Sequence, residues 1–326
     1  MCRTVRGPGH GLFVMPTTPC LHDASVHFPG ASRVTLTVHH TLSPIPPADA
    51  VSVQCAISST QFRRITKMLY AHAGIRMREG KEGLVRARLA KRLRVLNLPD
   101  FDAYLRYVDA QPDSAEFAAM IEALTTNKTS FLRESAHFDF LRDHVLPMLN
   151  EPVRIWSAGC ATGEEAYTLA MLLGDAYGNI DAYEHGDGCD ARVLATDINL
   201  RVLATAKGGS YPAALLSDVP TAWLERYWTR EVDAAGRDAY TVRPAIRRLV
   251  QFTALNLMED WSVAGPFDAI LCRNVMIYFD KATQQKLVER YWALLRPGGY
   301  LFVGHSESLT GMTHRLRYVQ PAVYVK

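Results

Sequence analysis

Apolar residues recur at helical spacing from Ser59 onward, and this period predicts a run of amphipathic helices. Asn97 and Pro99 end one helical pattern, and Ser114 precedes another as a candidate N-cap. The predicted helices cover Phe62–Tyr70, Lys81–Leu98, Phe101–Val108 and Ser114–Leu124. We therefore expect a small all-helical domain over residues 57–147.

From Val153 the pattern changes to short apolar runs that alternate with helical segments. This alternation predicts a doubly wound, mainly parallel α/β sheet in residues 148–326. The expected strands are Val153–Ser157, Arg192–Thr196, Leu249–Ala254, Phe267–Cys272 and Tyr300–Gly304. A helix over Lys281–Leu295 stops at a Pro-Gly-Gly sequence, and Tyr318–Val325 is expected as a closing strand that could return antiparallel.

Two segments fall outside this alternation. Residues 1–56 are rich in Pro, Gly, His and Thr and keep neither period, so we expect a disordered extension there. The connection between Gly208 and Arg248 is too long for an ordinary loop and is rich in aromatic residues. It predicts an inserted, β-rich subdomain at about residues 209–250, and such insertions often serve a partner or substrate.

Composition narrows the class of protein. The net charge of +3 over 326 residues is nearly neutral, which argues against nucleic acid as a partner. The six cysteines show no CxxC spacing, so we predict neither a metal site nor a disulfide framework. No apolar run approaches the roughly 20 residues that span a bilayer. We expect a cytoplasmic monomer without direct membrane insertion.

The candidate chemistry begins at Ser157-Ala-Gly-Cys-Ala-Thr-Gly-Glu-Glu165, a glycine turn between a predicted strand and a predicted helix. This order is typical of nucleotide-type cofactor sites. Glu164 and Glu165 would repel a pyrophosphate, whereas a ligand with a cationic amine or sulfonium would be attracted. The loop therefore favours S-adenosylmethionine over NAD or ATP. The alternative is a glycine-rich turn without a ligand, in which Gly159 and Gly163 only permit the turn rather than bring backbone amides to a cofactor.

Polar residues follow several of the predicted strands. Asp197 ends a strand roughly thirty residues after the glycine turn, where an acid can accept hydrogen bonds from both ribose hydroxyls. The alternative is that Asp197 caps the following helix. Arg273, Asn274 and Tyr278 follow the strand that ends at Cys272, and Asn256 ends the strand before it, so these side chains are expected in a ligand crevice.

A further polar segment, Leu124-Thr-Thr-Asn-Lys-Thr-Ser-Phe-Leu-Arg-Glu134, joins the two predicted domains. Its density of hydroxyls and amides is unusual for a linker. The alternative is a helix start capped by Thr129.

Together these motifs resemble the CheR family of chemotaxis receptor methyltransferases, and the resemblance spans residues 59–326. The motifs that carry it are Thr126-Asn-Lys-Thr-Ser-Phe-Leu-Arg-Glu134, Trp156–Glu165, Ala195-Thr-Asp-Ile198, Leu255-Asn-Leu257, Cys272-Arg-Asn-Val-Met-Ile-Tyr-Phe279 and Gly304-His-Ser-Glu-Ser308. One departure is mild, because the family often has Phe where Leu132 stands.

The resemblance implies a Rossmann-like class I methyltransferase sheet and transfer of a methyl group from S-adenosylmethionine to glutamates of bacterial chemoreceptors. The implied partners are the cytoplasmic helical regions of methyl-accepting receptors. The residues that it implies for the cofactor are Asn127, Thr129, Arg133, Glu164 for the methionine amine, Asp197 for the ribose, Asn256 and Leu257 near the adenine, and Arg273 with Asn274. It places Arg133 and Tyr278 near the transferable methyl.

The chemistry of such a transfer needs little from the protein. A glutamate has an unperturbed pKa of about 4.3, so its carboxylate is already the nucleophile at neutral pH and no general base is needed. Positioning can contribute roughly 7 to 11 kcal/mol. We expect Arg133 to guide the acidic acceptor and Tyr278 to orient it by hydrogen bonding.

The helix from Lys81 is strongly basic on its polar face, and we expect it to dock the acidic receptor helix. The candidate docking residues are Arg86, Arg88, Lys91, Arg92 and Arg94. The alternative is an ordinary solvated basic face.

Three other functions remain open. One is a methyltransferase for RNA or a small molecule, although Arg273-Asn-Val-Met276 stands where an Asn/Asp-Pro-Pro-aromatic motif is often found. Another is a catalytically silent adaptor that senses the cofactor, and the least favoured is a dehydrogenase. The insertion shows no evident Gly-x-Gly turn between Arg230 and Val242, so binding of a receptor tail peptide is not predicted.

Overall fold

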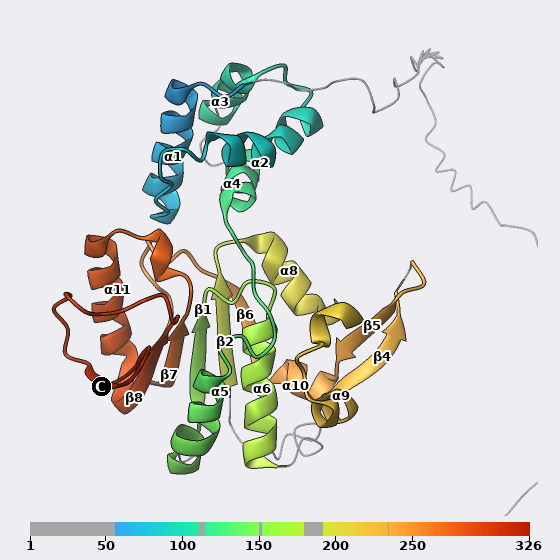
Figure 1. Ribbon diagram of the computed structural model, residues 1–326, viewed down its shortest axis with the longest axis vertical. Coiled ribbons are helices and arrows are strands. Elements are labelled where there is room, and N and C mark those ends of the chain that lie inside the picture. The colour runs from blue at the N-terminus through green and yellow to red at the C-terminus, as the bar shows by residue number, and fades with distance from the viewer. Residues whose placement is uncertain (1–55, 111–114, 150–151, 179–191, 234) are drawn as a thin grey trace, which may run out of the picture. The chain divides into compact units, whose positions relative to one another are not determined.

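A computed structural model describes residues 56–110, 115–149, 152–178, 192–233 and 235–326 (Figure 1). The expected N-terminal extension therefore lies almost entirely outside the described residues, as does the expected cap Ser114. No helix in the described ranges is both long enough and apolar enough to cross a bilayer.

The first part of the described chain forms a helical unit, the helices α1 to α4. Their bounds are α1 Ser59–Ala73, α2 Glu82–Val95, α3 Phe101–Asp109 and α4 Ala115–Leu124. Ser58 and Gln61 form a capping box at α1. The α2 helix ends sooner than expected, because Asn97 adopts a left-handed backbone (φ 52°) and Leu98 N donates to Leu93 O.

The helical unit has its own apolar core. Val85, Leu89 and Leu93 lie on one face of α2 and are completely buried. They pack with residues such as Ile65 of α1 and Tyr104 of α3. The amphipathic period of the sequence therefore places this core correctly.

Residues 125–135 have no regular helix and lead to α5 (Ala136–Phe140), η1 (Leu141–Val145) and η2 (Leu146–Met148). The main sheet follows, with strand order β6-β2-β1-β7-β8-β10-β9. The strands are β1 Arg154–Ala158, β2 Arg192–Asp197, β6 Val250–Ala254, β7 Phe267–Cys272, β8 Leu295–Val303, β9 Arg317–Gln320 and β10 Val323–Val325.

Strands β6, β2, β1, β7 and β8 are parallel, and β10 runs antiparallel to both β8 and β9. The expected single closing strand is thus a hairpin, because the chain turns at Ala322 (φ 63°). The strand order reverses between β1 and β7, and ligands of doubly wound sheets bind at such switch points. The predicted fold class is confirmed.

Helices cover both faces of the sheet, and successive strand residues pack into different cores. Ile155 of β1 packs with α6 (Glu164–Tyr177) and α10 (Pro244–Arg248), whereas Trp156 packs with α11 (Lys281–Leu294). The strands β7 and β8 divide in the same way. Both faces of the central strands are therefore buried, and their carboxyl ends are left to form the site.

The insertion is a small antiparallel sheet of order β3-β5-β4, drawn in yellow and orange in Figure 1. Its elements are β3 Ser210–Pro212, η3 Ala213–Leu216, α9 Thr221–Tyr227, β4 Trp228–Val232 and β5 Asp238–Val242, and it follows α8 (Leu200–Gly208). Tyr211 and Trp228 each pack edge-on against Phe131, at ring centroid distances of 5.1 and 5.3 Å. The insertion thereby supports the segment before α5.

Candidate functional site

A cavity of about 470 Å³ lies where β1, β2, β6 and β7 end. Nearly all the cofactor and catalytic residues expected from sequence line it, although they come from four separate segments. They are Asn127, Thr129, Arg133, Asp197, Asn256, Leu257, Arg273, Asn274 and Tyr278. Glu164 is the exception.

The glycine loop forms one side of the cavity, but it is not an anion cradle. The amides of Gly159 and Cys160 donate to Thr196 O at 2.8 and 2.9 Å, and Ala161 N donates to the Asp197 carboxylate at 2.9 Å. The expectation that the loop amides approach the ligand is thus wrong for these three. Because they are already bonded, the loop offers little to a phosphate.

Gly159 is required for a different reason than the one expected. Its backbone is left-handed (φ 96°), and a Cβ there would lie 2.4 Å from Val275 Cγ2. The glycine lets the loop pack against the segment that follows β7, which also lines the cavity.

Asp197 ends β2 and is almost completely buried. Its two oxygens accept from Ala161 N and Asn199 N, both at 2.9 Å. Burial raises the pKa of Asp197, and these backbone hydrogen bonds oppose the shift. A carboxylate has about four lone-pair sites, so two bonds still leave acceptors for a pair of hydroxyls.

The alternative role of Asp197 as a helix cap is wrong. Asn199 is the N-cap of α8, because its Oδ1 accepts from Arg201 N at 3.0 Å and Val202 N at 3.3 Å. Asp197 is therefore available to the cavity.

The acidic side of the cavity comes from Glu165 rather than Glu164. The Glu164 carboxylate is buried away from the cavity and accepts from Thr162 Oγ1 at 2.7 Å, and burial raises its pKa. Glu165 lines the cavity and accepts from Ser157 Oγ at 2.7 Å and from Arg273 Nη1 at 2.8 Å. Neighbouring helix residues point about 100° apart, so a sequence with two adjacent glutamates cannot say which one faces the ligand.

Arg273 is buried at the end of β7, and its donors are directed into the protein. Besides Glu165, it donates to Arg133 O and pairs with Glu134 Oε2 at 3.2 Å. Its guanidinium also lies 5.1 Å from the ring centroid of Phe138. Arg273 thus joins three segments of the site while it forms part of the cavity lining.

Glu134 contacts two residues of the cavity lining, Arg273 and Asn274, and the sequence predictions assigned it no role, although it ends a quoted motif. Its carboxylate accepts from Arg273, from Asn274 Nδ2 at 3.2 Å and from His305 N at 3.2 Å. Burial opposes its ionisation, but Arg273 and the hydrogen bonds from Asn274 and Arg273 outweigh it and lower the pKa of Glu134. Leu132 and Glu134 both have left-handed backbones (φ 53° and 56°), a strained turn that the surrounding contacts must stabilise.

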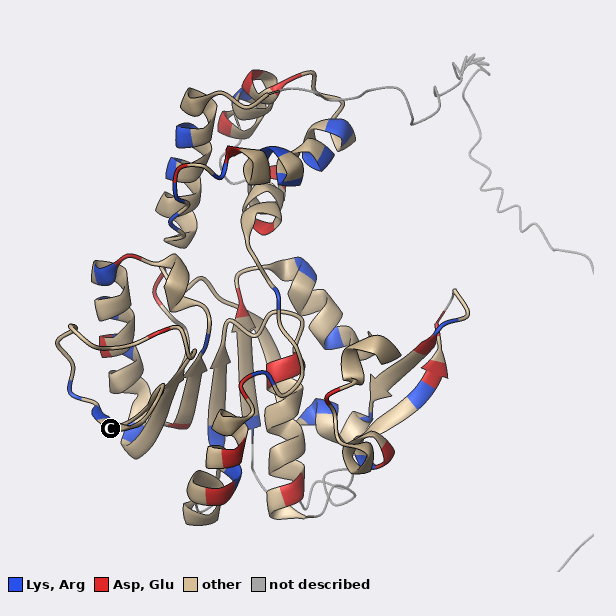
Figure 2. Ribbon diagram, viewed as in Figure 1, with Lys and Arg blue, Asp and Glu red and all other residues tan. Residues whose placement is uncertain are grey.

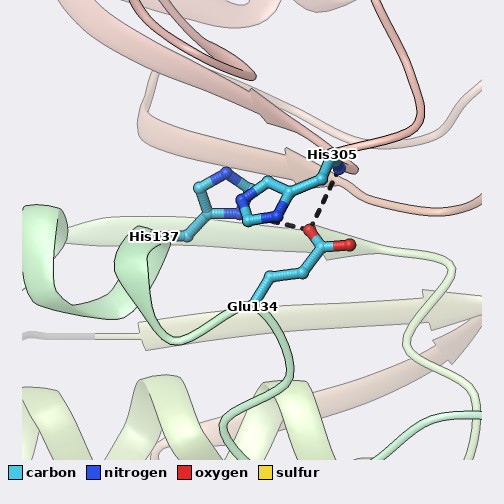
Figure 3. Close-up of side chains that lie close together, drawn as sticks. All are labelled: Glu134, His137 and His305. Carbon is cyan, nitrogen blue, oxygen red and sulfur yellow. Dashed lines mark hydrogen bonds and ion pairs between the residues drawn. The ribbon is translucent and has the colours of Figure 1, made fainter.

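His137 and His305 lie beside this carboxylate (Figure 3), with one ligand-type atom of each group within 4.8 Å of the others. His137 is buried, and burial together with the charge of Arg273 lowers its pKa to about 4. We attribute the lowered pKa of Glu134 to its ion pair with Arg273, because the guanidinium already supplies the positive charge beside this carboxylate.

Arg133 and Tyr278, the expected catalytic pair, both line the cavity. Arg133 Nη1 donates to Lys128 O at 2.9 Å, which folds the side chain back over its own segment. Thr129 is not a helix cap, since the next helix begins at Ala136. The alternative reading of this segment as a capped helix start is therefore wrong.

The helical unit closes another side of the cavity. Residues 73 and 75–78 line it, together with Lys81 and Leu84. Arg76 N donates to Tyr278 O at 2.8 Å, and Asn256 Nδ2 donates to His72 O at 2.7 Å. No sequence motif indicated these residues, because their contacts run largely through the backbone.

The junction with the helical unit also involves Asn127. Its Oδ1 accepts from Asn199 Nδ2 and from Thr125 Oγ1, both at 3.0 Å. Asn127 is thereby fixed in the cavity lining, with its Oδ1 already satisfied by the protein.

The basic face of α2, blue in Figure 2, divides into two sets. Arg88 donates to Leu124 O at 2.6 Å and to Thr126 Oγ1 at 2.9 Å, and Arg92 pairs with the buried Glu116. The expectation that these two arginines dock a partner is therefore corrected, because they hold the helical unit together. The residues left exposed are Arg86, Lys91 and Arg94.

Comparison with known proteins finds relatives over most of the chain. Residues 127–325 match the family model described as CheR methyltransferase, SAM binding domain, and residues 60–125 match CheR methyltransferase, all-alpha domain. A chemotaxis protein methyltransferase 2 of Pseudomonas aeruginosa is 42% identical over 81% of this chain and 91% of its own length. The chemotaxis protein methyltransferases of Salmonella typhimurium and Escherichia coli are 41% and 40% identical, each over 82% of this chain and 91% of its own length.

Proposed function

This chain belongs to the CheR methyltransferase family and is a methyltransferase that uses S-adenosylmethionine, and from that premise we propose that it methylates glutamate side chains of bacterial chemoreceptors. The products are a glutamate methyl ester and S-adenosylhomocysteine. The observation that carries this proposal is the convergence of the expected site residues on one cavity that offers carboxylates, while the glycine-loop amides of Gly159, Cys160 and Ala161 are already bonded within the protein. The family, the fold class and the cofactor predicted from sequence are confirmed.

The cavity lining fits this cofactor. Asp197 would accept from the ribose hydroxyls, and Glu165 would pair with the methionine ammonium, replacing Glu164 in that role. Leu257 and Ile198 offer an apolar surface for the adenine, with Asn256 beside it. When bound, the cofactor supplies an activated methyl group on a sulfonium.

The acceptor needs positioning rather than deprotonation. A receptor glutamate is ionised at neutral pH, so its carboxylate could accept the methyl group without a general base. Arg133 would guide the acceptor carboxylate, and the Tyr278 hydroxyl would orient it. Arg76, Arg78 and Lys81 add positive charge to the same cavity and favour an acidic acceptor.

We also infer that Arg86, Lys91 and Arg94 dock the acidic face of the receptor helix. They are exposed on α2, while Arg88 and Arg92 are engaged within the helical unit. Exposed charged contacts of this kind affect the rate of encounter and the register of binding more than the rate of the chemical step.

Methyl transfer from labelled S-adenosylmethionine to receptor-containing membranes tests the proposal. We expect alkali-labile methyl esters on receptor glutamates, and their loss when the acceptor glutamates are replaced by alanine. Cofactor binding without any methyl ester across a panel of receptors would instead favour the silent adaptor. Methylation of RNA or of small molecules in place of receptor would contradict the proposed substrate.

A further inference from the structure

Glu307, in the segment after β8, is a buried carboxylate that does not line the cavity. Its oxygens accept from three backbone amides: Asn274 N at 2.9 Å, Ile277 N at 3.0 Å and Gly304 N. Two of these donors belong to the loop after β7, residues 274–278, which ends at Tyr278. The carboxylate therefore binds the backbone of the loop that carries a proposed catalytic side chain.

This loop needs such support. Asn274 has a left-handed backbone (φ 58°), a conformation that asparagine adopts more readily than most residues but less readily than glycine. Gly304 faces the same turn closely, since a Cβ on it would lie 2.5 Å from Asn274 Nδ2 and 2.8 Å from Asn274 N. On the opposite side Val275 packs against Gly159 of the glycine loop. The loop is thus in close contact with Gly304 and Gly159, and its backbone is bonded to the Glu307 carboxylate.

Burying a carboxylate is costly unless its acceptors are satisfied. Desolvation raises the pKa of Glu307, and the backbone hydrogen bonds from Gly304, Asn274 and Ile277 oppose that shift. These bonds fix the loop rather than join two helices or strands. The cost of burying the carboxylate is therefore offset by contacts to the loop itself.

We propose that Glu307 is a positioning residue for methyl transfer: its carboxylate sets the backbone of residues 274–278 so that Tyr278 meets the acceptor. This inference rests on the proposed function. Glu307 does not itself line the cavity, and its bonds to the cavity-lining residues Asn274 and Ile277 are to their backbone amides, so it acts through the loop.

Replacement of Glu307 by Gln separates this role from simple packing. Glutamine has nearly the same shape, but its amide places N–H donors against at least one of the three backbone N–H groups. Leaving such a pair unsatisfied should lower kcat by roughly 10- to 100-fold. Affinity for S-adenosylhomocysteine, measured by calorimetry, should change less than about threefold. Glu289→Gln, on an exposed part of α11, is the matched control and should leave both values unchanged.

A double-mutant cycle with Tyr278→Phe tests the route of the effect. If Glu307 acts through Tyr278, then Glu307→Gln should cost far less activity in the Tyr278→Phe background than in the wild type. Equal losses in both backgrounds, or full activity of Glu307→Gln, would overturn the inference. If Glu307→Gln does not fold, Gly304→Ala can replace it, because it disturbs the same loop through Asn274. This variant should likewise lower kcat with little change in affinity for S-adenosylhomocysteine, and its effect on kcat should be smaller in the Tyr278→Phe background. Equal losses in the two backgrounds, or full activity, would count against the inference there too. Absence of methyl ester with wild-type protein would point instead to failure of the proposed function.

Discussion

The cavity has two sides of different construction. The sheet side carries its ligand-facing groups at strand ends and in the glycine loop, and their positions follow from the doubly wound topology. The helical side is lined by residues between 73 and 84, and the helical unit contacts the sheet side through backbone groups such as Arg76 N and His72 O. The sheet side suits a fixed cofactor, whereas the basic helical side suits an acceptor that arrives with another protein.

The largest expected effect is that of Asp197→Asn, a substitution on the sheet side of the cavity. The amide would place an N–H donor against Ala161 N or Asn199 N and would lose acceptors for the ribose. We expect affinity for S-adenosylhomocysteine to fall about 100-fold, equivalent to roughly 2.7 kcal/mol. Calorimetric titration of the variant, with Asp260→Asn at the exposed surface as control, measures this change. Unchanged affinity would remove Asp197 from the cofactor site.

The second prediction concerns His137, a buried residue beside Glu134. His137 has a pKa of about 4, below the value near 6.5 expected in the unfolded chain. Between these values the unfolded state binds more protons, so the free energy of unfolding should decrease as pH falls from about 6.5 to 4. The loss attributable to His137 should be on the order of 2 kcal/mol.

Denaturant unfolding at several pH values tests this prediction. His137→Gln should flatten the decrease over the acid range, whereas His144→Gln, an exposed control, should leave it unchanged. An identical pH dependence in all three proteins would show that His137 is not the group that titrates.

The third prediction separates the two adjacent glutamates of the glycine loop. Glu165→Gln removes a negative charge from the cavity lining and should weaken cofactor binding about 10-fold, or roughly 1.4 kcal/mol. Glu164→Gln should affect cofactor affinity much less, because Glu164 faces away from the cavity and is satisfied by Thr162. The two affinities, measured side by side, check the assignment. The opposite order would restore Glu164 as the amine-binding residue.

Residues at the carboxyl ends of strands were the most predictable from the sequence. Asp197 ends one buried strand, and Arg273 and Asn274 follow another. Parallel strands end at a common edge, so the convergence of these residues on one cavity could be predicted. Motif identity added Asn127 and the expected role of Tyr278 near the methyl group.

Roles that depend on the orientation of a side chain, or on contacts between distant segments, were less predictable from the sequence. The helical period predicts which face of α2 is buried, but not that Arg88 reaches the carbonyl of Leu124, 36 positions away. The links of Glu134 to Asn274 and His305 likewise join segments more than a hundred residues apart. Such contacts depend on how segments distant in sequence pack within each domain, which local pattern does not encode.

The smallest effect is expected on the helical side, at its exposed basic face. Replacing Arg86, Lys91 and Arg94 together by Ala should raise KM for receptor about three- to tenfold, because exposed ion pairs are screened and each contributes only about 0.2–1 kcal/mol. Cofactor affinity and kcat at saturating receptor should stay unchanged, and the KM difference should shrink as salt is raised. Arg92→Ala is the contrasting variant: it removes the cationic partner of the buried Glu116, which keeps the hydrogen bond from Tyr104, and should lower the unfolding free energy instead. If the triple variant methylates receptor with an unaltered KM at low salt, the exposed face of α2 is a solvated surface and the acceptor is recognised at the cavity alone.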